Sequence, residues 1–343
     1  MSKTNPGRFF EDYSVGQVIR HAVPRTVSGG ERALYHALYP ARHALYSSDE
    51  FARKSGLPAS PIDDLIAFHL VFGKTVPDIS LNAVANLGYA EGRFLKPVYP
   101  GDTLRSESEV IGLKQNSNGK TGVVYVRTNG LNQRDETVIS YVRWVMVRKR
   151  DIDAPAPETV MPELVKTVAL NDLILPDGLN FSDYDFDLAG EPHRWGDYNV
   201  GELIDHVDGV TLEDAEHMQA TRLWQNTAKV HFDATFRPDG QRLIYGGHII
   251  SLARTLSFNG LANAQMIAGI NAGAHVNPAF AGDTVKAWSE VLDKEETATP
   301  DVGALRLRLV ATKGGNVGEL KGEDGKYLPG VLLDLDYWVL IPM

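Results

Sequence analysis

The sequence predicts an α+β protein made of two diverged copies of one unit, each a buried helix with an antiparallel sheet. Three observations lead to this prediction. The chain has 343 residues, more than one hydrophobic core usually holds. Several motifs occur twice and in the same order. Each copy also shows the same succession of expected helices and strands.

The internal repeat rests on three pairs of segments. One pair shares the motif DYxVGxxI, the second shares PxxxGDT, and the third is an apolar run around a tryptophan. The third pair is displaced further along the chain than the first two, which predicts a longer loop in the second copy, at residues 313–326. The matched segments are 12–19 with 197–204, 94–104 with 275–285, and 141–147 with 335–341.

The first copy begins with helices. Leucines in residues 28–46 have a spacing that suits a helix, and residues 47–50 (SSDE) form a capping-box pattern that predicts a further short one. Residues 62–72 are apolar on all sides, which is typical of a buried helix. Runs that alternate or are rich in β-branched residues then predict strands at 82–99, 103–114, 120–131 and 137–148.

The second copy repeats this order. Helices are expected at 211–225 and 247–256, and strands near 266–280, 284–292, 304–312 and 331–341. Each copy is thus a buried helix followed by an antiparallel meander, and two such sheets can cover each other. The predicted parts are an N-terminal unit (1–150), a linker rich in proline and aspartate that packs across the surface (151–194), and a C-terminal unit (195–343).

Composition and charge disfavour several partners. The chain is 43% hydrophobic and 23% charged, as expected for a soluble globular protein. Its formal net charge of -10 repels nucleic acid. No apolar run approaches the roughly 20 residues that span a membrane, so no membrane partner is expected. The chain has no cysteine, which fits a reducing compartment, and the predicted location is the cytoplasm.

Familiar catalytic motifs do not occur. The chain contains no HExxH, GxGxxG, Walker or GxSxG pattern, which disfavours a metal site, a dinucleotide site and a serine hydrolase. The glycines of residues 314–318 lie between two expected strands and predict a hairpin loop.

The residues best suited to chemistry lie in the second copy, in segments 225–233 and 243–248. His231 can move protons near neutral pH. Gly246 and Gly247 open a helix, where uncovered N–H groups can bind a developing oxyanion. Other interpretations stay open: the glycines serve only close packing, and His231 is an ordinary histidine. His248, on the buried helix, is expected to be structural.

This pattern resembles the MaoC-like hydratases of the hot-dog fold, over nearly the whole chain. The resemblance is carried by the buried helix, the PxxxGDT hairpin and the segment that ends in His231 before a Gly-Gly helix start. Within these hydratases, the mesaconyl-CoA hydratases, also called β-methylmalyl-CoA dehydratases, are the most similar. The resemblance implies a tandem hot-dog fold, in which each half wraps an antiparallel sheet around a central helix.

MaoC-like hydratases carry the motif Asp-x-Asn-Pro-x-His, whose Asp and His act on the water that adds to an enoyl thioester. The resemblance places His231 at the His and Asn226 at the Asp. An amide cannot accept the proton that the family's aspartate would take, so Asn226 is expected to orient the water. The oxyanion donor maps onto Gly247, and Tyr245 and Gly246 beside it are assigned to substrate binding.

The first copy has Tyr46 at the position of His231 and an Asp pair, residues 63–64, at that of the Gly pair. It is therefore expected to have lost the chemistry and to shape the acyl pocket. The carboxylate that the family's aspartate would supply, and that Asn226 lacks, is expected to come from Asp233 or from that Asp pair. Asp64 is also assigned to substrate binding. A carboxylate on the substrate would pair with an arginine near the pocket, and the candidates are Arg42, Arg222 and Arg254.

The resemblance implies reversible hydration of a short branched dicarboxylic enoyl-CoA, with mesaconyl-CoA and β-methylmalyl-CoA as substrate and product. No cofactor or metal is expected, since coenzyme A is part of the substrate, and exposed sheet edges favour a homodimer or a higher homo-oligomer. Two alternatives are an acyl-CoA thioesterase with Asp64 as base, and an acyl-CoA binding protein without activity.

Overall fold

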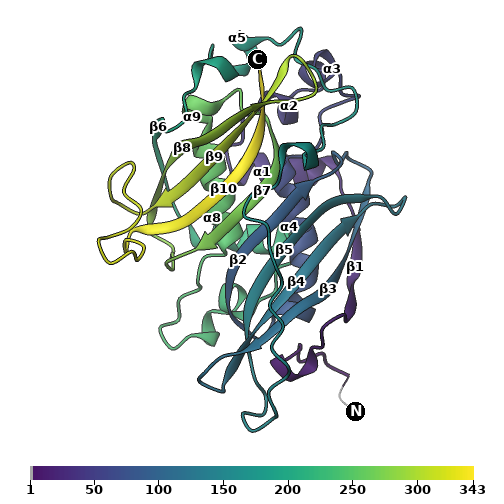
Figure 1. The fold of residues 1–343 in the computed structure, drawn as a ribbon, viewed down its shortest axis with the longest axis vertical. Helices are drawn as coiled ribbons and strands as arrows, with labels where there is room; N and C mark the ends of the chain where they lie inside the picture. Colours follow the sequence, from purple (N-terminus) through teal and green to yellow (C-terminus); the bar gives the residue numbers. More distant parts are fainter. Residues whose placement is uncertain (1–2) are drawn as a thin grey trace.

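The computed structural model describes residues 3–343 and contains one antiparallel sheet of ten strands (Figure 1). The strand order is β1-β3-β4-β5-β2-β7-β10-β9-β8-β6, so the five strands of each copy lie together. The strands are β1 (Val18–Thr26), β2 (Ala83–Phe94), β3 (Thr103–Gln115), β4 (Thr121–Leu131), β5 (Thr137–Arg148), β6 (Leu203–Thr211), β7 (Met266–His275), β8 (Thr284–Glu296), β9 (Val302–Thr312) and β10 (Val331–Pro342).

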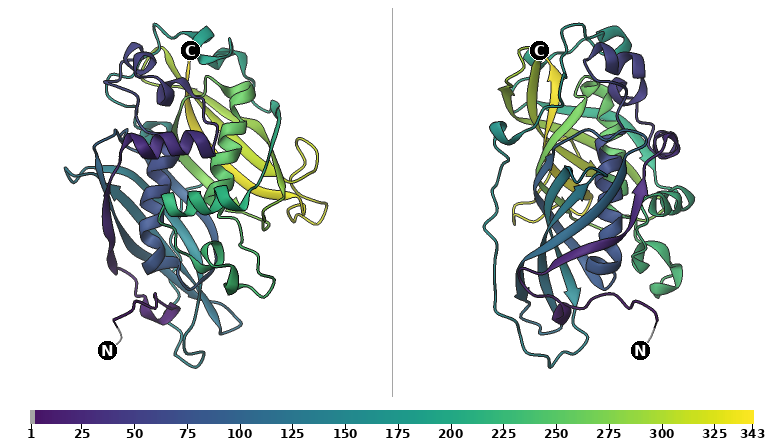
Figure 2. Two further views of the ribbon diagram at one scale, coloured as in Figure 1. Left: turned by 180° about the vertical axis from the view of Figure 1, so that it is seen from behind. Right: turned by 90° about the vertical axis from the view of Figure 1, so that its right-hand side faces the viewer.

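Apart from α5 (Phe186–Ala189), which belongs to the segment 151–194, the helices lie on one face of this sheet (Figure 2). They are α1 (Gly29–Leu38), α2 (Ala44–Ser47), α3 (Asp49–Lys54), α4 (Asp64–Thr75), α5 (Phe186–Ala189), α6 (Asp214–Leu223), α7 (Lys229–Phe232), α8 (Gly246–Leu256) and α9 (Phe258–Leu261), with a π-helical turn η2 (Val76–Ser80) and 3₁₀ turns at Phe10–Asp12, Leu170–Asp172, Trp195–Asp197 and Ala234–Phe236. Among the residues described, no helix is long and apolar enough to cross a membrane.

Helices α4 and α8 are the two central helices. Every residue of α4 is buried, as its apolar sequence predicts. Helix α8 is buried from Gly247 to Thr255. Leu65 of α4 and Ile250 of α8 belong to the same hydrophobic cluster, so the two halves share one continuous core.

The two halves join edge to edge through β2 and β7. Tyr89 pairs with Gly273 and Gly92 pairs with Ile270 across this junction. A Cβ atom on Gly92 would lie 2.8 Å from Cβ of Ile270, so the close approach of the strands requires glycine there. The two sheets therefore complete each other as one sheet, whereas the sequence suggested that they would cover each other.

Each half has five strands, not the four expected. The missed strands are β1 and β6, which lie at the two edges of the sheet. Most of their side chains are not buried, so the alternation that marks a half-buried strand is weak. The expected meander is also only partly correct: β3, β4 and β5 follow one another, but β2 pairs with β5 and β1 pairs with β3.

Two connections that the sequence singled out can be followed in the structure. Residues 151–194 cross the face of the sheet opposite the helices, as Figure 2 shows. Val160 forms a β-bridge with Leu113, and the N–H of Val168 donates to Asn271 Oδ1 at 2.8 Å. The β9–β10 connection, which includes residues 313–326, is much longer than the β4–β5 connection at 132–136.

Candidate active site

A cavity of about 280 Å³ lies where the start of α8 meets strands β2, β5 and β7. Both halves of the chain contribute to its walls. No Asp or Glu lines it in the described part of the chain. Its polar side chains include Asn86, Tyr89 and Arg143 from the first half and Asn226, His231 and His275 from the second.

His231 stands on the short helix α7 at the wall of the cavity. Its Nδ1 lies 2.7 Å from the carbonyl oxygen of Leu243. Since a carbonyl can only accept, Nδ1 carries the proton and Nε2 keeps a lone pair. Burial lowers the pKa of His231 to about 4, so the ring is neutral at pH 7. A neutral imidazole with a fixed tautomer is suited to take a proton.

Asn226 lies five positions before His231 and is only 1% exposed. Its Oδ1 accepts the N–H of Ala228 at 3.2 Å, and its own N–H donates to the carbonyl of Thr221 at 2.9 Å. Ala228 is the residue that precedes α7 and has no capping side chain of its own. Asn226 therefore lines the cavity and also holds the turn that carries His231.

Gly246 and Gly247 form the first turn of α8, where backbone N–H groups have no carbonyl within the helix to bind. A Cβ on Gly246 would lie 2.4 Å from the His275 ring, and one on Gly247 would lie 2.4 Å from the Tyr245 ring. Close packing is therefore one reason for both glycines. Gly246 lines the cavity, whereas Gly247 is buried against the rings of Tyr245 and His69.

Tyr245 precedes α8 and joins the cavity wall to a buried histidine cluster. Its N–H donates to His217 Nε2 at 2.9 Å, and its hydroxyl lies 3.5 Å from His69 Nδ1. His248 contacts the hydroxyl of Tyr39 through Nδ1 at 2.7 Å and is 1% exposed. Burial lowers the pKa of His69, His217 and His248 to about 3, so this cluster is neutral and supports the helix start.

The sequence reasoning missed His275, Tyr89 and Arg143 as members of the site. His275 Nε2 lies 3.2 Å from the Tyr89 hydroxyl, and burial lowers the pKa of His275 to about 4. His275 stands opposite Phe94 in the second pair of repeated segments, so comparison of the copies at that position carried the signal. Arg143 lies at a buried position among Tyr141 and Val145 of β5, where alternation predicts an apolar residue.

Four predicted site residues lie outside the cavity, which corrects the expectation that they meet the substrate there. Asp233 accepts the N–H of Thr235 at 2.9 Å and caps a surface turn. Arg42 is exposed and stacks over the Phe258 ring at 4.4 Å, and Arg222 is exposed on α6. Arg254 is 3% exposed and donates to Ser257 Oγ and to the carbonyl of Ala264.

Asp64 belongs to a different place, at the start of α4. It accepts hydrogen bonds from the hydroxyl of Tyr46 and from the N–H of Ile267, the latter at 2.8 Å. It borders a void of only about 10 Å³, which Ile174 and Pro176 of the crossing segment also line. The expectation that Asp64 binds substrate, or replaces the missing carboxylate, is therefore corrected. Asp63 caps α4 by accepting the N–H of Leu65 at 2.9 Å.

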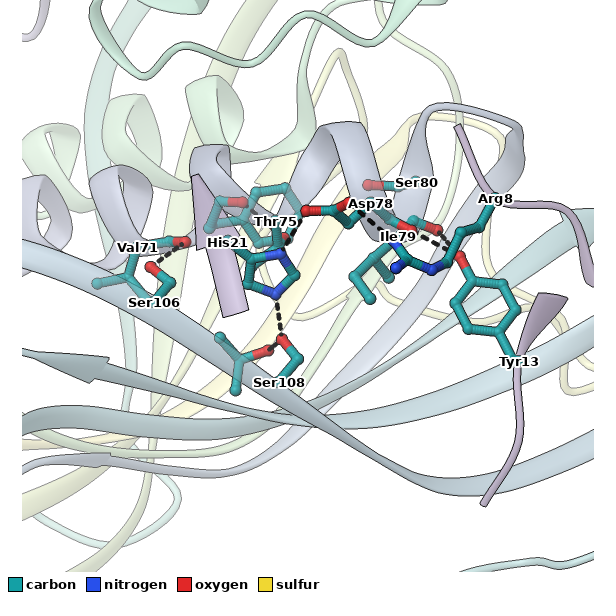
Figure 3. Close-up of polar contacts among 12 residues, drawn as sticks. Arg8, Tyr13, His21, Val71, Thr75, Asp78, Ile79, Ser80, Ser106 and Ser108 are labelled. Carbon is teal, nitrogen blue, oxygen red and sulfur yellow. Dashed lines mark hydrogen bonds and ion pairs between the residues drawn. The ribbon is translucent and has the colours of Figure 1, made fainter. Parts of the chain in front are cut away.

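A second polar cluster has the order of contacts of a Ser-His-Asp triad. In Figure 3, His21 lies between Asp78 Oδ2, 2.9 Å from Nδ1, and Ser108 Oγ, 2.8 Å from Nε2. Ser108 is 1% exposed. In the second half, His206 Nε2 lies 2.8 Å from Ser289 Oγ in the same way. There Nδ1 contacts the backbone carbonyl of Asn259 instead of a carboxylate. Because the contact recurs without the acid and is buried, we assign it to the attachment of β1 and β6 to the sheet.

Comparisons with known proteins agree with this geometry. The sequence profile of the family described as mesaconyl-CoA hydratase matches residues 2–317. A mesaconyl-CoA hydratase of Cereibacter sphaeroides is 78% identical over 99% of both chains. A β-methylmalyl-CoA dehydratase of Chloroflexus aurantiacus is 60% identical, again over 99% of both.

Solved structures confirm the tandem hot-dog fold. The crystal structure of a MaoC domain dehydratase from Chloroflexus aurantiacus superposes with a TM-score of 0.98, at 59% identity and with 100% and 99% of the two chains covered. A Mycobacterium tuberculosis protein with a double hot-dog fold has a TM-score of 0.74 at 24% identity, covering 98% and 99%. With its fold, its cavity and its sequence in agreement, the chain belongs to the mesaconyl-CoA hydratase family.

Proposed function

We infer that this protein catalyses the reversible hydration of mesaconyl-CoA to β-methylmalyl-CoA. The observation that carries this inference is a cavity with a neutral histidine beside a glycine helix start, in a chain 78% identical to a mesaconyl-CoA hydratase. The mesaconyl group is a methyl-substituted fumaryl group, so a free carboxylate stands on one carbon of its double bond. The names of both close relatives describe the two directions of this one reaction.

In the proposed mechanism, the thioester carbonyl oxygen lies at the start of α8, where the Gly246 N–H polarises it. This polarisation draws electrons from the double bond toward the thioester and makes its β-carbon electrophilic. His231 Nε2 takes a proton from water as the water oxygen bonds to the β-carbon. The double bond is lost as His231 passes this proton on to the α-carbon, so that H and OH of one water add across the bond and His231 is neutral again. Dehydration runs through the same steps in reverse.

The glycine assignment differs by one residue from the sequence expectation. The resemblance pointed to Gly247, but Gly246 is the glycine that lines the cavity. Gly247 then supports the site by letting the Tyr245 and His69 rings approach the helix.

Asn226 suits a substrate that carries its own carboxylate. An aspartate at this position would place a second negative charge near the substrate, and like charges a few ångströms apart repel strongly in a cavity that excludes water. An amide avoids that repulsion and still offers hydrogen bonds to water. Asn226 thereby holds the water and the α7 turn together, and His231 alone acts as the base.

The test is an absorbance assay of the wild-type chain with mesaconyl-CoA. Loss of the enoyl absorbance without release of free thiol is expected. A thioesterase would release the coenzyme A thiol, which a thiol reagent detects. A binding protein would hold the ester with no change in either signal. The thioesterase alternative has lost support because its expected base, Asp64, borders the small void of the first half.

The remaining expectations on partners are proposals too. We propose a coenzyme A thioester as the small-molecule partner, a homodimer or higher homo-oligomer as the assembly, and the cytoplasm as the location. Sedimentation at several concentrations would check the assembly, since a single boundary at the monomer mass would contradict it.

A further inference from the structure

Arg143 is a buried cation without an anionic partner. It projects from β5 into the wall of the cavity and is 0% exposed. Its Nη2 donates to Thr75 Oγ1 at 2.6 Å and approaches Ser80 Oγ at 3.5 Å. Thr75, the last residue of α4, and Ser80, the last of η2, are labelled in Figure 3. The Nε and Nη1 of Arg143 have no hydrogen-bond partner. Within residues 3–343 no carboxylate forms an ion pair with it.

Such an arrangement is costly for a folded chain. An uncompensated buried charge loses its hydration without gaining a countercharge, which destabilises the folded state. The Phe72 ring, 4.2 Å from the guanidinium carbon, offsets only part of this loss through a cation–π contact. Arg306 pairs with Asp336 at 2.7 Å, and the buried Arg254 donates to Ser257 Oγ and to the carbonyl of Ala264. Among the residues described, Arg143 has no carboxylate, and two of its three guanidinium nitrogens have no acceptor at all. Arg143 therefore has the properties of a group whose partner arrives with a ligand.

A second observation points to the same spot. Asn86 lines the cavity from β2, next to β5, and neither its Oδ1 nor its Nδ2 has a hydrogen-bond partner. Buried side-chain amides are normally satisfied on both atoms. The unpaired amide of Asn86 and the two unpaired nitrogens of Arg143 form a polar subsite at one wall. The other lining on this side is largely apolar and includes Phe72, Val76 and Ala83.

We propose that Arg143 binds the free carboxylate of the substrate and selects dicarboxylic enoyl-CoA esters, with Asn86 as a further donor. Among the described residues that line the cavity, Arg143 is the one permanently charged side chain, since His231 and His275 are neutral and no Asp or Glu contributes. A guanidinium offers the planar donors that a carboxylate accepts. This inference rests on the function proposed above and adds the residue that decides substrate class.

The pairing also has a role in the reaction. In a fumaryl thioester the free carboxylate stands on the β-carbon, which is the carbon that water attacks. Its negative charge repels an incoming oxygen lone pair, and a guanidinium partner offsets that repulsion. Because Arg143 is fully buried, the wall must move slightly to admit the carboxylate, and we expect this movement at Asn86 when a dicarboxylic ligand binds.

The test compares two substrates on three enzymes. The substrates are mesaconyl-CoA and the enoyl-CoA of the same skeleton with a methyl group in place of the carboxylate. The enzymes are wild type, Arg143→Gln, and Arg148→Gln as a control on the same strand, where Arg148 is exposed. We expect R143Q to lower kcat/KM for mesaconyl-CoA about 100-fold, as loss of a buried charge pair commonly does. The other substrate should change less than about threefold, and R148Q should match wild type.

Equal losses on both substrates in a folded R143Q, or an unchanged preference, would overturn the proposal. If R143Q does not fold, wild-type inhibition decides instead: succinyl-CoA should bind more tightly than butyryl-CoA, and equal inhibition would refute the assignment. A wild-type enzyme that hydrates only the monocarboxylic ester would instead refute the proposed function, so the two failures are distinguishable.

Discussion

The two central helices begin in opposite ways, although they occupy equivalent places in the two halves. Helix α8 begins with two glycines beside a cavity of about 280 Å³, with His231 at its wall. Helix α4 begins with two aspartates, and Tyr46 fills the place of His231 by donating to Asp64. The crossing segment closes what is left, a void of about 10 Å³. A helix start can bind an oxyanion only where no carboxylate of the chain already occupies it.

The same comparison shows that the first half is still part of the site. Its strands β2 and β5 supply Asn86, Tyr89 and Arg143 to the cavity that α8 opens. We propose that one half has kept the chemistry at its helix start and that the other has kept only its contribution to the substrate wall. The following predictions test this division, from the largest expected effect to the smallest.

Removal of the proposed base, His231, should show the largest difference in activity between matched substitutions in the two halves. His231→Ala should lower kcat for mesaconyl-CoA hydration about 1,000-fold, within the range for general acid–base groups. Tyr46→Phe, at the equivalent position of the first half, should leave kcat within about twofold. Steady-state assays measure both, and thermal melting controls for folding. Comparable losses in the two variants would contradict the division.

A methyl group added at the start of α8 should also lower the catalytic rate. Gly246→Ala places a Cβ within 2.4 Å of the His275 ring and displaces the ring or the helix. We expect kcat to fall about 100-fold, as for loss of an oxyanion donor. Ala253→Gly, further along α8, is the matched control for backbone change in this helix. If G246A were fully active, the N–H at this position would not polarise the thioester.

Restoring the acid of the wider superfamily should reduce activity. Asn226→Asp puts a carboxylate near the substrate's own, and we expect kcat/KM for mesaconyl-CoA to fall about tenfold through repulsion. For the analogue without the carboxylate, kcat/KM should not fall. The substrate pair described for Arg143 provides the measurement. Equal or better hydration of mesaconyl-CoA by N226D would show that Asn226 is not an adaptation to a second charge.

The acidic helix start should make stability depend on pH. Burial raises the pKa of Asp64 to about 7, above its value of 3.8 in an unfolded chain. The folded state therefore holds this proton more tightly. Its contribution to stability is complete below about pH 4 and is lost as pH rises through 7. Asp64→Asn should flatten the unfolding free energy between pH 5 and 7, by about 1 kcal/mol per pH unit.

Chemical denaturation at several pH values measures that slope. Asp187→Asn, an exposed position, should leave the slope unchanged. An identical slope in wild type and D64N would show that Asp64 is ionised throughout.

The triad-like cluster should have almost no effect on catalysis. Ser108→Ala removes a hydrogen bond that the second half forms equally through Ser289, so we expect a loss of about 1 kcal/mol in stability and less than twofold in hydratase rate. Thiol release from acyl-CoA esters by wild type, absent in S108A, would assign a hydrolase function to the cluster instead.

The sequence was sufficient for most of the fold because the repeat and the strand alternation are local patterns. It missed β1 and β6, whose exposed side chains carry little alternation, and it could not show that β2 returns to pair with β5. The pairing of β2 with β5 depends on contacts between residues that are distant in sequence.

The sequence predicted the site residues that lie in short motifs with recognisable chemistry. It missed residues that only the pairing of distant strands brings to the cavity. His231 and the glycine pair lie in two short segments, so their residue types and positions indicated them, and the resemblance to the MaoC-like motif added Asn226. Arg143 reaches the cavity only because β5 and β2 bring the first half beside α8. The arginines favoured from sequence are exposed, or bind carbonyls of their own half.

The junction of β2 with β7 has a consequence for how such an enzyme can evolve. In a dimer of identical single units, every substitution enters both sites at once, so an aspartate pair at the helix start would abolish all activity. Two units held in one polypeptide and one sheet can change independently. Covalent fusion thereby allows one of two equivalent sites to be lost, and it lets the strands beside the other site adapt to a substrate with a free carboxylate at the end of its acyl group opposite the thioester.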